Sequence, residues 1–273
     1  MLLTRVITAV CLLLLILPIL FLAPPAALAG LVAVIVLLGG WEFGRLIGLR
    51  GAWPYVYAVA CLLVLIGWHD APQRDAVTWL LEASLIAWGV ALVLMARGVR
   101  TATPAFTALG VVLGLIMLPA FGHAVMVLRA AGIGVLLTAA VLVWAADIGA
   151  YFVGKAIGKR KLAPTISPGK SWEGAIGGWL LAMIVALSLA ATHMFAPTWY
   201  SLVADKGGLR LVVILTTLLV AASIVGDLFE SLLKRQVGMK DSSRLLPGHG
   251  GILDRIDALI PVFPLAALLL AWI

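Results

Sequence analysis

Charge is what this 273-residue sequence has least of. Asp, Glu, Lys and Arg together make up 11% of the chain, whereas hydrophobic residues make up 64%. The mean hydropathy is +1.17. A soluble domain would be less apolar, because water must wet its outer surface. The composition therefore excludes an ordinary soluble globular protein and predicts an integral membrane protein.

Cysteine is nearly absent as well. The chain has only Cys11 and Cys61, and both lie inside apolar runs. Two isolated cysteines exclude a disulfide framework and a cysteine zinc site. We interpret both as small hydrophobic residues of the core.

Short alternating strands are also missing. Barrel strands have about 9–11 alternating residues, whereas the apolar runs here reach the roughly 20 residues of a membrane-spanning helix. The pattern excludes an outer-membrane barrel and predicts an all-α, polytopic membrane protein of one domain, with five spans in residues 1–130 and four in 131–273. The nine expected spans are 5–23, 26–42, 53–69, 77–96, 104–121, 131–151, 173–196, 209–232 and 252–273.

The first apolar run, ITAVCLLLLILPILFLA, admits two interpretations. It could be a secretory signal peptide or a retained helix. The run is long for a signal peptide, and the following PPAALAG leads directly into another apolar run. These features favour a retained first helix.

Basic residues predict the orientation. Lys and Arg concentrate in cytoplasmic loops, and 15 of the 19 basic residues fall before span 1, after the even-numbered spans or at the start of span 9. The charge pattern therefore predicts an inner-membrane protein whose N-terminus is cytoplasmic and whose C-terminus lies on the far side. The exceptions are Arg74, Arg129, Lys206 and Arg210.

Four aspartates border apolar runs on the predicted cytoplasmic side. An ionised carboxylate inside a span costs about 2.5–3.5 kcal/mol, so such residues usually face a cavity or a cation. Together they suit Mg²⁺, which prefers oxygen ligands and bridges to substrate phosphates; a neighbouring monovalent cation such as K⁺ is left open, as are ordinary ion pairs. The four candidates are Asp147, Asp227, Asp254 and Asp257.

Glycines and basic residues accompany these acids in two loops, SPGKSWEG (167–174) and KDSSRLLPGHGGILDRID (240–257). Glycine can adopt positive φ and bring backbone N–H groups close to an anion. Together the loops predict a phosphate site, although lipid head groups alone would explain Lys159, Arg160 and Lys161. The candidate phosphate-binding residues are Ser167, Lys170, Lys240, Arg244, His249, Gly250, Gly251 and Arg255.

The stretch SLLKRQVGMKDSSRLLPGHGGILDRID (231–257) resembles the motif of the phosphatidate cytidylyltransferases, also called CDP-diacylglycerol synthases. That family combines a Ser, a Lys-Arg pair, Lys-Asp, His-Gly-Gly and Asp-Arg followed by Asp. Its Ser-Pro-x-Lys element is similar to residues 167–174, and its Asp with a following Tyr is matched by Asp147 and Tyr151. Gly169 departs from the pattern, because a second Lys is common there. The resemblance covers the C-terminal half of the chain.

The resemblance implies that CTP and phosphatidic acid react, with Mg²⁺, to give CDP-diacylglycerol and pyrophosphate within a lipid bilayer. It implies catalytic roles for Asp227, Asp254, Lys240 and His249. Asp227 and Asp254 would hold the metal, with Asp257 or Asp147 in support, and the other candidates would bind phosphates. No nucleic acid is expected as a partner, and a homodimer is left open.

Three rival functions make different demands on the sequence. A CTP-dependent polyprenol or lipid kinase would use similar contacts but release CDP. A CDP-alcohol phosphotransferase is disfavoured, because its Asp-Gly…Ala-Arg…Gly…Asp…Asp run is absent. A transporter would place its polar residues near the middle of the membrane, whereas these lie at the ends of spans.

Overall fold

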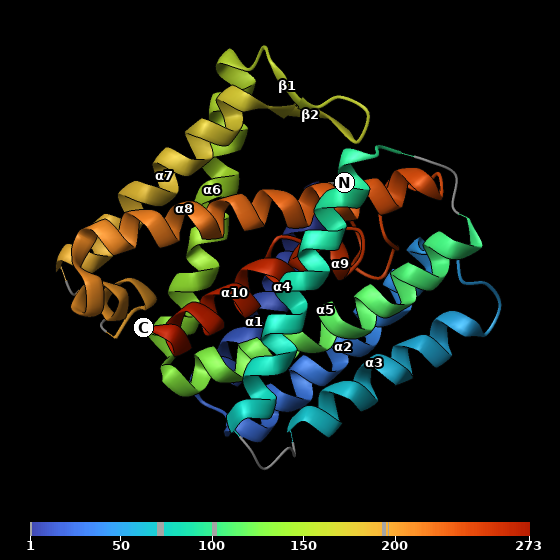
Figure 1. The fold of residues 1–273 in the computed structure, drawn as a ribbon, viewed down its shortest axis with the longest axis horizontal. Coiled ribbons are helices and arrows are strands. Elements are labelled where there is room, and N and C mark those ends of the chain that lie inside the picture. Colours follow the sequence, from blue (N-terminus) through green and yellow to red (C-terminus); the bar gives the residue numbers. More distant parts are fainter. Residues whose placement is uncertain (1, 70–73, 100–102, 193–194, 196) are drawn as a thin grey trace.

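A computed structural model describes residues 2–69, 74–99, 103–192, 195 and 197–273. This part of the chain forms a helical bundle with one small hairpin (Figure 1). The helices are α1 (Leu2–Phe21), α2 (Pro25–Leu46), α3 (Trp53–His69), α4 (Arg74–Ala96), α5 (Pro104–Ala131), α6 (Ile133–Ile157), α7 (Trp172–Thr192), α8 (Trp199–Gln236), α9 (Leu253–Ile256) and α10 (Leu259–Trp272). The strands are β1 (Lys161–Ala163) and β2 (Ser167–Ser171).

Seven of the described helices, α1, α2 and α4 to α8, are long and apolar enough to cross a membrane. Helices α3 and α10 are apolar but shorter. The 14 residues of α10 reach about 21 Å at 1.5 Å per residue, less than the roughly 30 Å of a hydrocarbon core. The predicted all-α, multi-pass membrane fold is confirmed, whereas the number nine stays a prediction.

Local sequence explains where several helices begin. Pro25 and Pro104 open α2 and α5, at a position where the missing N–H of proline has no cost. Thr198 caps α8 in a reciprocal capping box with Ser201. The predicted start of the eighth span, residue 209, corresponds to a kink, because Gly208 has a φ of 67°. The helix itself extends back to Trp199.

The last predicted span, 252–273, is interrupted instead of continuous. Its first residues form the short helix α9, and α10 begins at Leu259. Pro261 has no N–H to donate to the carbonyl of Asp257, four residues earlier. Asp257 therefore lies at a break between two helices.

Small residues bring α6 and α7 close together. A Cβ atom on Gly149 would lie 2.6 Å from the carbonyl oxygen of Gly177, and one on Gly178 would collide with the carbonyl oxygen of Ala146. Only glycine allows two helix backbones to approach in this way. This close packing fixes the α6 side of the cavity described below.

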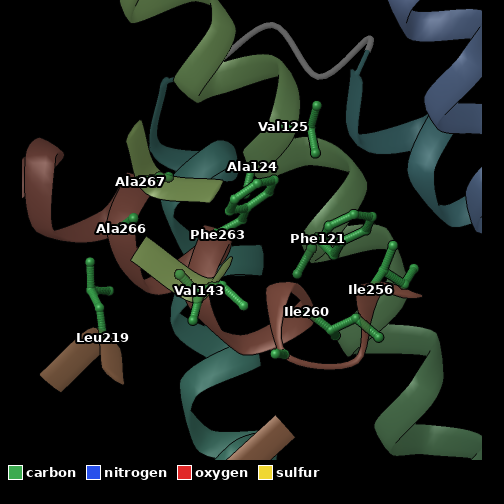
Figure 2. Packing of buried hydrophobic residues seen from close by; sticks show 14 of the residues in the cluster. Phe121, Ala124, Val125, Val143, Leu219, Ile256, Ile260, Phe263, Ala266 and Ala267 are labelled. Carbon is green, nitrogen blue, oxygen red and sulfur yellow. The ribbon is translucent and has the colours of Figure 1, made fainter. Parts of the chain in front are cut away.

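Helix α10 passes through the middle of the bundle and contacts α4, α5, α6 and α8 (Figure 1). Its Phe263 ring stacks on Phe121 of α5, with ring centroids 5.7 Å apart (Figure 2). Ala266 and Ala267 of α10 are also buried there. This core joins the N-terminal helices to α6 and α8.

Hydrogen bonds show which helix ends meet. Thr8, near the start of α1, donates to the carbonyl of Pro247, and Arg235, near the end of α8, donates to that of Ile166 in the hairpin turn. Thr107 at the start of α5 donates to Ile47 after α2. These ends were predicted to share one side of the membrane. Among the basic residues used for that prediction, Arg100 and the side chain of Arg74 lie outside the described residues.

Candidate active site

A cavity of about 550 Å³ lies between α6, α7, α8 and β2. Asp147 of α6, Lys170 of β2 and Asp227 of α8 line it, together with Tyr151 and Ser223. The Lys170 Nζ atom is 2.5 Å from Asp227 Oδ2, and about a third of each side chain is exposed. The structure therefore brings Lys170, Asp147 and Asp227, all predicted site residues, to one cavity.

A β-hairpin positions Lys170, although the sequence predicted only a loop there. Strands β1 and β2 pair in antiparallel fashion. At the base of the hairpin, the Glu173 carboxylate accepts hydrogen bonds from the backbone N–H groups of Lys159 and Arg160. Ser171 Oγ accepts from the N–H of Gly174 at the start of α7. These bonds attach both ends of the hairpin to α7.

A buried ion triad lies further along the same face of α8, because Glu230 and Lys234 follow Asp227 at helical i+3 and i+7 spacing. Lys234 Nζ is 2.5 Å from Glu230 Oε2 and 2.7 Å from Asp254 Oδ1. The second oxygen of Asp254 accepts from the backbone N–H and hydroxyl of Ser242, at 2.9 and 2.8 Å, and from the N–H of Gly251 at 2.8 Å. Lys234, Ser242 and Gly251 thus together satisfy both oxygens of the Asp254 carboxylate.

Asp254 and Asp257 are three residues apart in the sequence, but their environments differ. Asp257 lies close enough to Asp227 and Lys170 for direct electrostatic interaction, and its Oδ1 accepts the N–H of Ala258. Asp147 likewise interacts with Asp227 and Lys170. Asp257 also interacts with Lys234, which is already paired with Glu230 and Asp254. The carboxylates near these two lysines outnumber them, which leaves an excess of negative charge.

The chemistry of this carboxylate group fits a hard divalent cation. Among the described residues, no three His, Cys, Asp or Glu side chains converge closely enough to enclose a metal ion. Mg²⁺ does not require such a cage, because it keeps several waters and binds through one or two carboxylates plus substrate phosphates. Asp227 with Asp147 or Asp257 provides that donor set.

The remaining predicted phosphate ligands lie elsewhere. Lys240 and Arg244 line a second cavity of about 520 Å³, together with Arg45 at the end of α2. Arg255 is exposed, and Ser167 is half-buried in β2. Lys170 therefore lines a different cavity from Lys240 and Arg244, and Arg255 lines neither of the two.

The glycine turn adopts the predicted backbone. Gly248 and Gly250 have φ values of 77° and 84°, which glycine tolerates best. The N–H of Gly251, however, already donates to Asp254 within the protein. His249 Nδ1 is buried without a hydrogen-bond partner. An anion role for these groups stays a prediction.

The shared metal site of Asp227 and Asp254 also stays a prediction. Asp227 pairs with Lys170 and accepts from Ser231, whereas Asp254 pairs with Lys234. Each carboxylate is thus held by a different lysine.

Glu42 of α2 was missed by the reasoning from sequence. Its side chain is fully buried and accepts hydrogen bonds from the loop before α9. The signal was present, because VLLGGWEFGRLIG holds one acid within an apolar run. Ionisable residues in such runs are candidates for functional roles.

A multi-pass helical membrane protein with a charged cavity between its C-terminal helices is the class that this geometry defines. A model of the cytidylyltransferase family matches residues 3–273, so the chain belongs to that family. The chain is 42% identical over 271 residues to a phosphatidate cytidylyltransferase of Pseudomonas aeruginosa, covering 97% of this chain and 96% of that protein. It is 53% identical over 133 residues to one of Haemophilus influenzae, covering 49% of this chain and 44% of that protein. The resemblance found in residues 231–257 is confirmed.

Replacing Lys170 by Ala should lower kcat/KM for CTP at least about tenfold, because losing a charged contact costs about 1.5–3 kcal/mol. Steady-state CTP turnover in detergent with phosphatidic acid checks this. Lys161→Ala, at an exposed position of strand β1 in the same hairpin, is the control and should keep wild-type kinetics. Wild-type kinetics in Lys170→Ala would instead assign Lys170 to general positive charge at the membrane surface.

Proposed function

We propose that this protein transfers the cytidylyl group of CTP to phosphatidic acid, giving CDP-diacylglycerol and pyrophosphate. The observation that carries the proposal is the cavity lined by Lys170, Asp227 and Asp147, in a chain whose whole length matches the cytidylyltransferase family. The relatives named as phosphatidate cytidylyltransferases support the choice of substrate.

The reaction needs little acid–base chemistry. A phosphate oxygen of phosphatidic acid forms a bond to the α-phosphorus of CTP, and the bond from that phosphorus to the bridging oxygen breaks. The electron pair leaves with pyrophosphate. Because both reactants are anions, catalysis depends on holding them together and stabilising charge on the leaving group. Lys170 would bind a phosphate in the first cavity, and Lys240 and Arg244 would bind phosphates at the second.

We propose that Mg²⁺ is held by Asp227 and Asp254, with Asp257 or Asp147 in support. A bound magnesium ion would neutralise phosphate charge. Lys170 and Asp227 are already paired in the structure, so the lysine would orient the carboxylate.

We also propose nine spans, with α3 and the α9–α10 unit as the two added to the seven longer helices. The N-terminus and both candidate cavities would face the cytoplasm across the inner membrane. The distribution of basic residues supports this orientation. The acyl chains of the substrate would remain in the bilayer while its head group enters the first cavity.

The products separate this activity from its nearest rival. With CTP labelled separately in its cytidine and its γ-phosphate, we expect label in CDP-diacylglycerol and in pyrophosphate, in equal amounts. A lipid kinase would instead transfer the γ-phosphate to lipid and release CDP. Chromatographic detection of CDP with a labelled lipid phosphate would refute the proposed transfer.

The variants Asp227→Asn and Asp254→Asn test the shared metal. Each should lower Mg²⁺-dependent turnover at least about a hundredfold, since both remove charge that acts on the reacting phosphates. The double variant should be scarcely worse than either single one, because residues that act as a unit are not additive. Asp205→Asn, exposed on the same helix as Asp227, is the control. Substantial turnover in either single variant, with unchanged Mg²⁺ dependence and thermal stability, would contradict a shared site.

Reporter fusions test the orientation. A reporter placed after Ile273 should read as periplasmic, whereas one inserted in the hairpin turn at Thr165 should read as cytoplasmic, since the turn joins the basic loop after α6. The measurement is reporter activity in intact cells, with expression checked by immunoblot. If both fusions report the same compartment, the nine-span arrangement is wrong.

A further inference from the structure

Glu42 is a fully buried acid at the cytoplasmic-side end of α2 that no step proposed above uses. Its Oε1 accepts from Ser243 Oγ at 2.5 Å and from the N–H of Ile252 at 3.0 Å. Its Oε2 accepts from Ser242 Oγ at 3.1 Å and from the N–H of Leu253 at 2.7 Å. Each carboxylate oxygen therefore faces one hydroxyl and one backbone N–H.

The four donors come from the two ends of one loop. Ser242 and Ser243 lie where the chain enters the glycine turn, and Ile252 and Leu253 lie where it leaves the turn and begins α9. A single side chain from the N-terminal half thus holds both ends of the loop together. Asp254 of α9 also accepts from both ends of the loop, through Ser242 and Gly251.

Ser242 and Gly251 connect Glu42 to Asp254, one of the proposed metal ligands. Ser242 Oγ lies within hydrogen-bond distance of both Glu42 Oε2 and Asp254 Oδ2. Gly251 packs so closely that a Cβ atom there would collide with Ser242 Oγ and Glu42 Oε1. Gly251 thus lies against Glu42 and Ser242 while its N–H donates to Asp254.

We propose that Glu42 is a positioning residue for cytidylyl transfer: it sets the path of residues 242–253 and thereby the orientation of Asp254. The inference rests on the proposed function only for its activity measurement. Loop order is measured separately, without substrate or metal.

Glu42→Gln tests the inference because the amide is nearly the same shape as the carboxylate. An amide has one oxygen, so in either orientation its NH₂ group faces a backbone N–H, of Ile252 or of Leu253. The expected results are a drop in kcat/KM of about tenfold or more and faster hydrogen exchange of the amides of residues 242–253. Exchange in α6 and α7 should stay unchanged.

Two further variants complete the design. Ser243→Ala removes one hydroxyl donor to Glu42 but does not place two N–H groups against each other, as Glu42→Gln does. The Glu42→Gln/Ser243→Ala double variant should be no worse than Glu42→Gln, because the two residues form one interaction. Glu82→Gln, exposed on α4, is the matched control and should change neither measurement.

The outcomes are distinct. Wild-type exchange of residues 242–253 in Glu42→Gln would overturn the inference, as would faster exchange with undiminished turnover. Faster exchange throughout α6, α7 and α8 would also overturn it, since Glu42 would then stabilise the whole fold. If Glu42→Gln does not fold, Glu42→Asp and Ser243→Ala are measured singly and combined. Additive losses of exchange protection and turnover in the combined variant would overturn the inference, and non-additive losses would support it. An inactive wild-type protein with normal exchange would refute the proposed function but leave the loop contact testable by exchange.

Discussion

The burial of irregular backbone is the constraint on which this structure depends. A buried backbone N–H or C=O group needs a hydrogen-bond partner, so a buried non-helical segment is tolerated only where the protein supplies one. The loop between α8 and α9 meets this condition through two carboxylates. Asp254 accepts the N–H groups of Ser242 and Gly251, and Glu42 accepts those of Ile252 and Leu253. Asp254 and Glu42 therefore stabilise the loop backbone, whether or not a substrate is bound.

The same constraint explains the two kinds of acid in the molecule. Glu42 and Asp254 are largely occupied by internal donors, whereas Asp227 and Asp147 line an open cavity. Glu230 and Lys234 join α8 to α9 through the buried triad. Removing one partner of such a buried pair leaves an uncompensated charge, which is far more costly than the net gain from forming the pair. Glu42 and Asp254 are thus held by donors within the protein, whereas Asp227 and Asp147 retain lone pairs for a ligand.

Much of the fold was predictable, because apolar runs of spanning length and proline or threonine starts are local signals. Trp53–His69 coincides with the predicted third span, and the positive φ of Gly250 follows from its turn. The β1–β2 hairpin was not predictable, since SPGKS has neither alternation nor β-branched residues. The sequence also did not reveal which lysine pairs with which aspartate. Glu42 and Ser242 are 200 residues apart, and a single sequence does not reveal which distant residues pair.

The hydroxyl of Ser242 lies between two carboxylates but carries only one proton. At any instant it can donate to Glu42 or to Asp254, and the carboxylate that it leaves still keeps its backbone donors. The loop therefore has two hydrogen-bonded arrangements that differ only by rotation of one O–H bond. A change of charge beside Asp254 can shift the balance between them while every backbone atom stays in place.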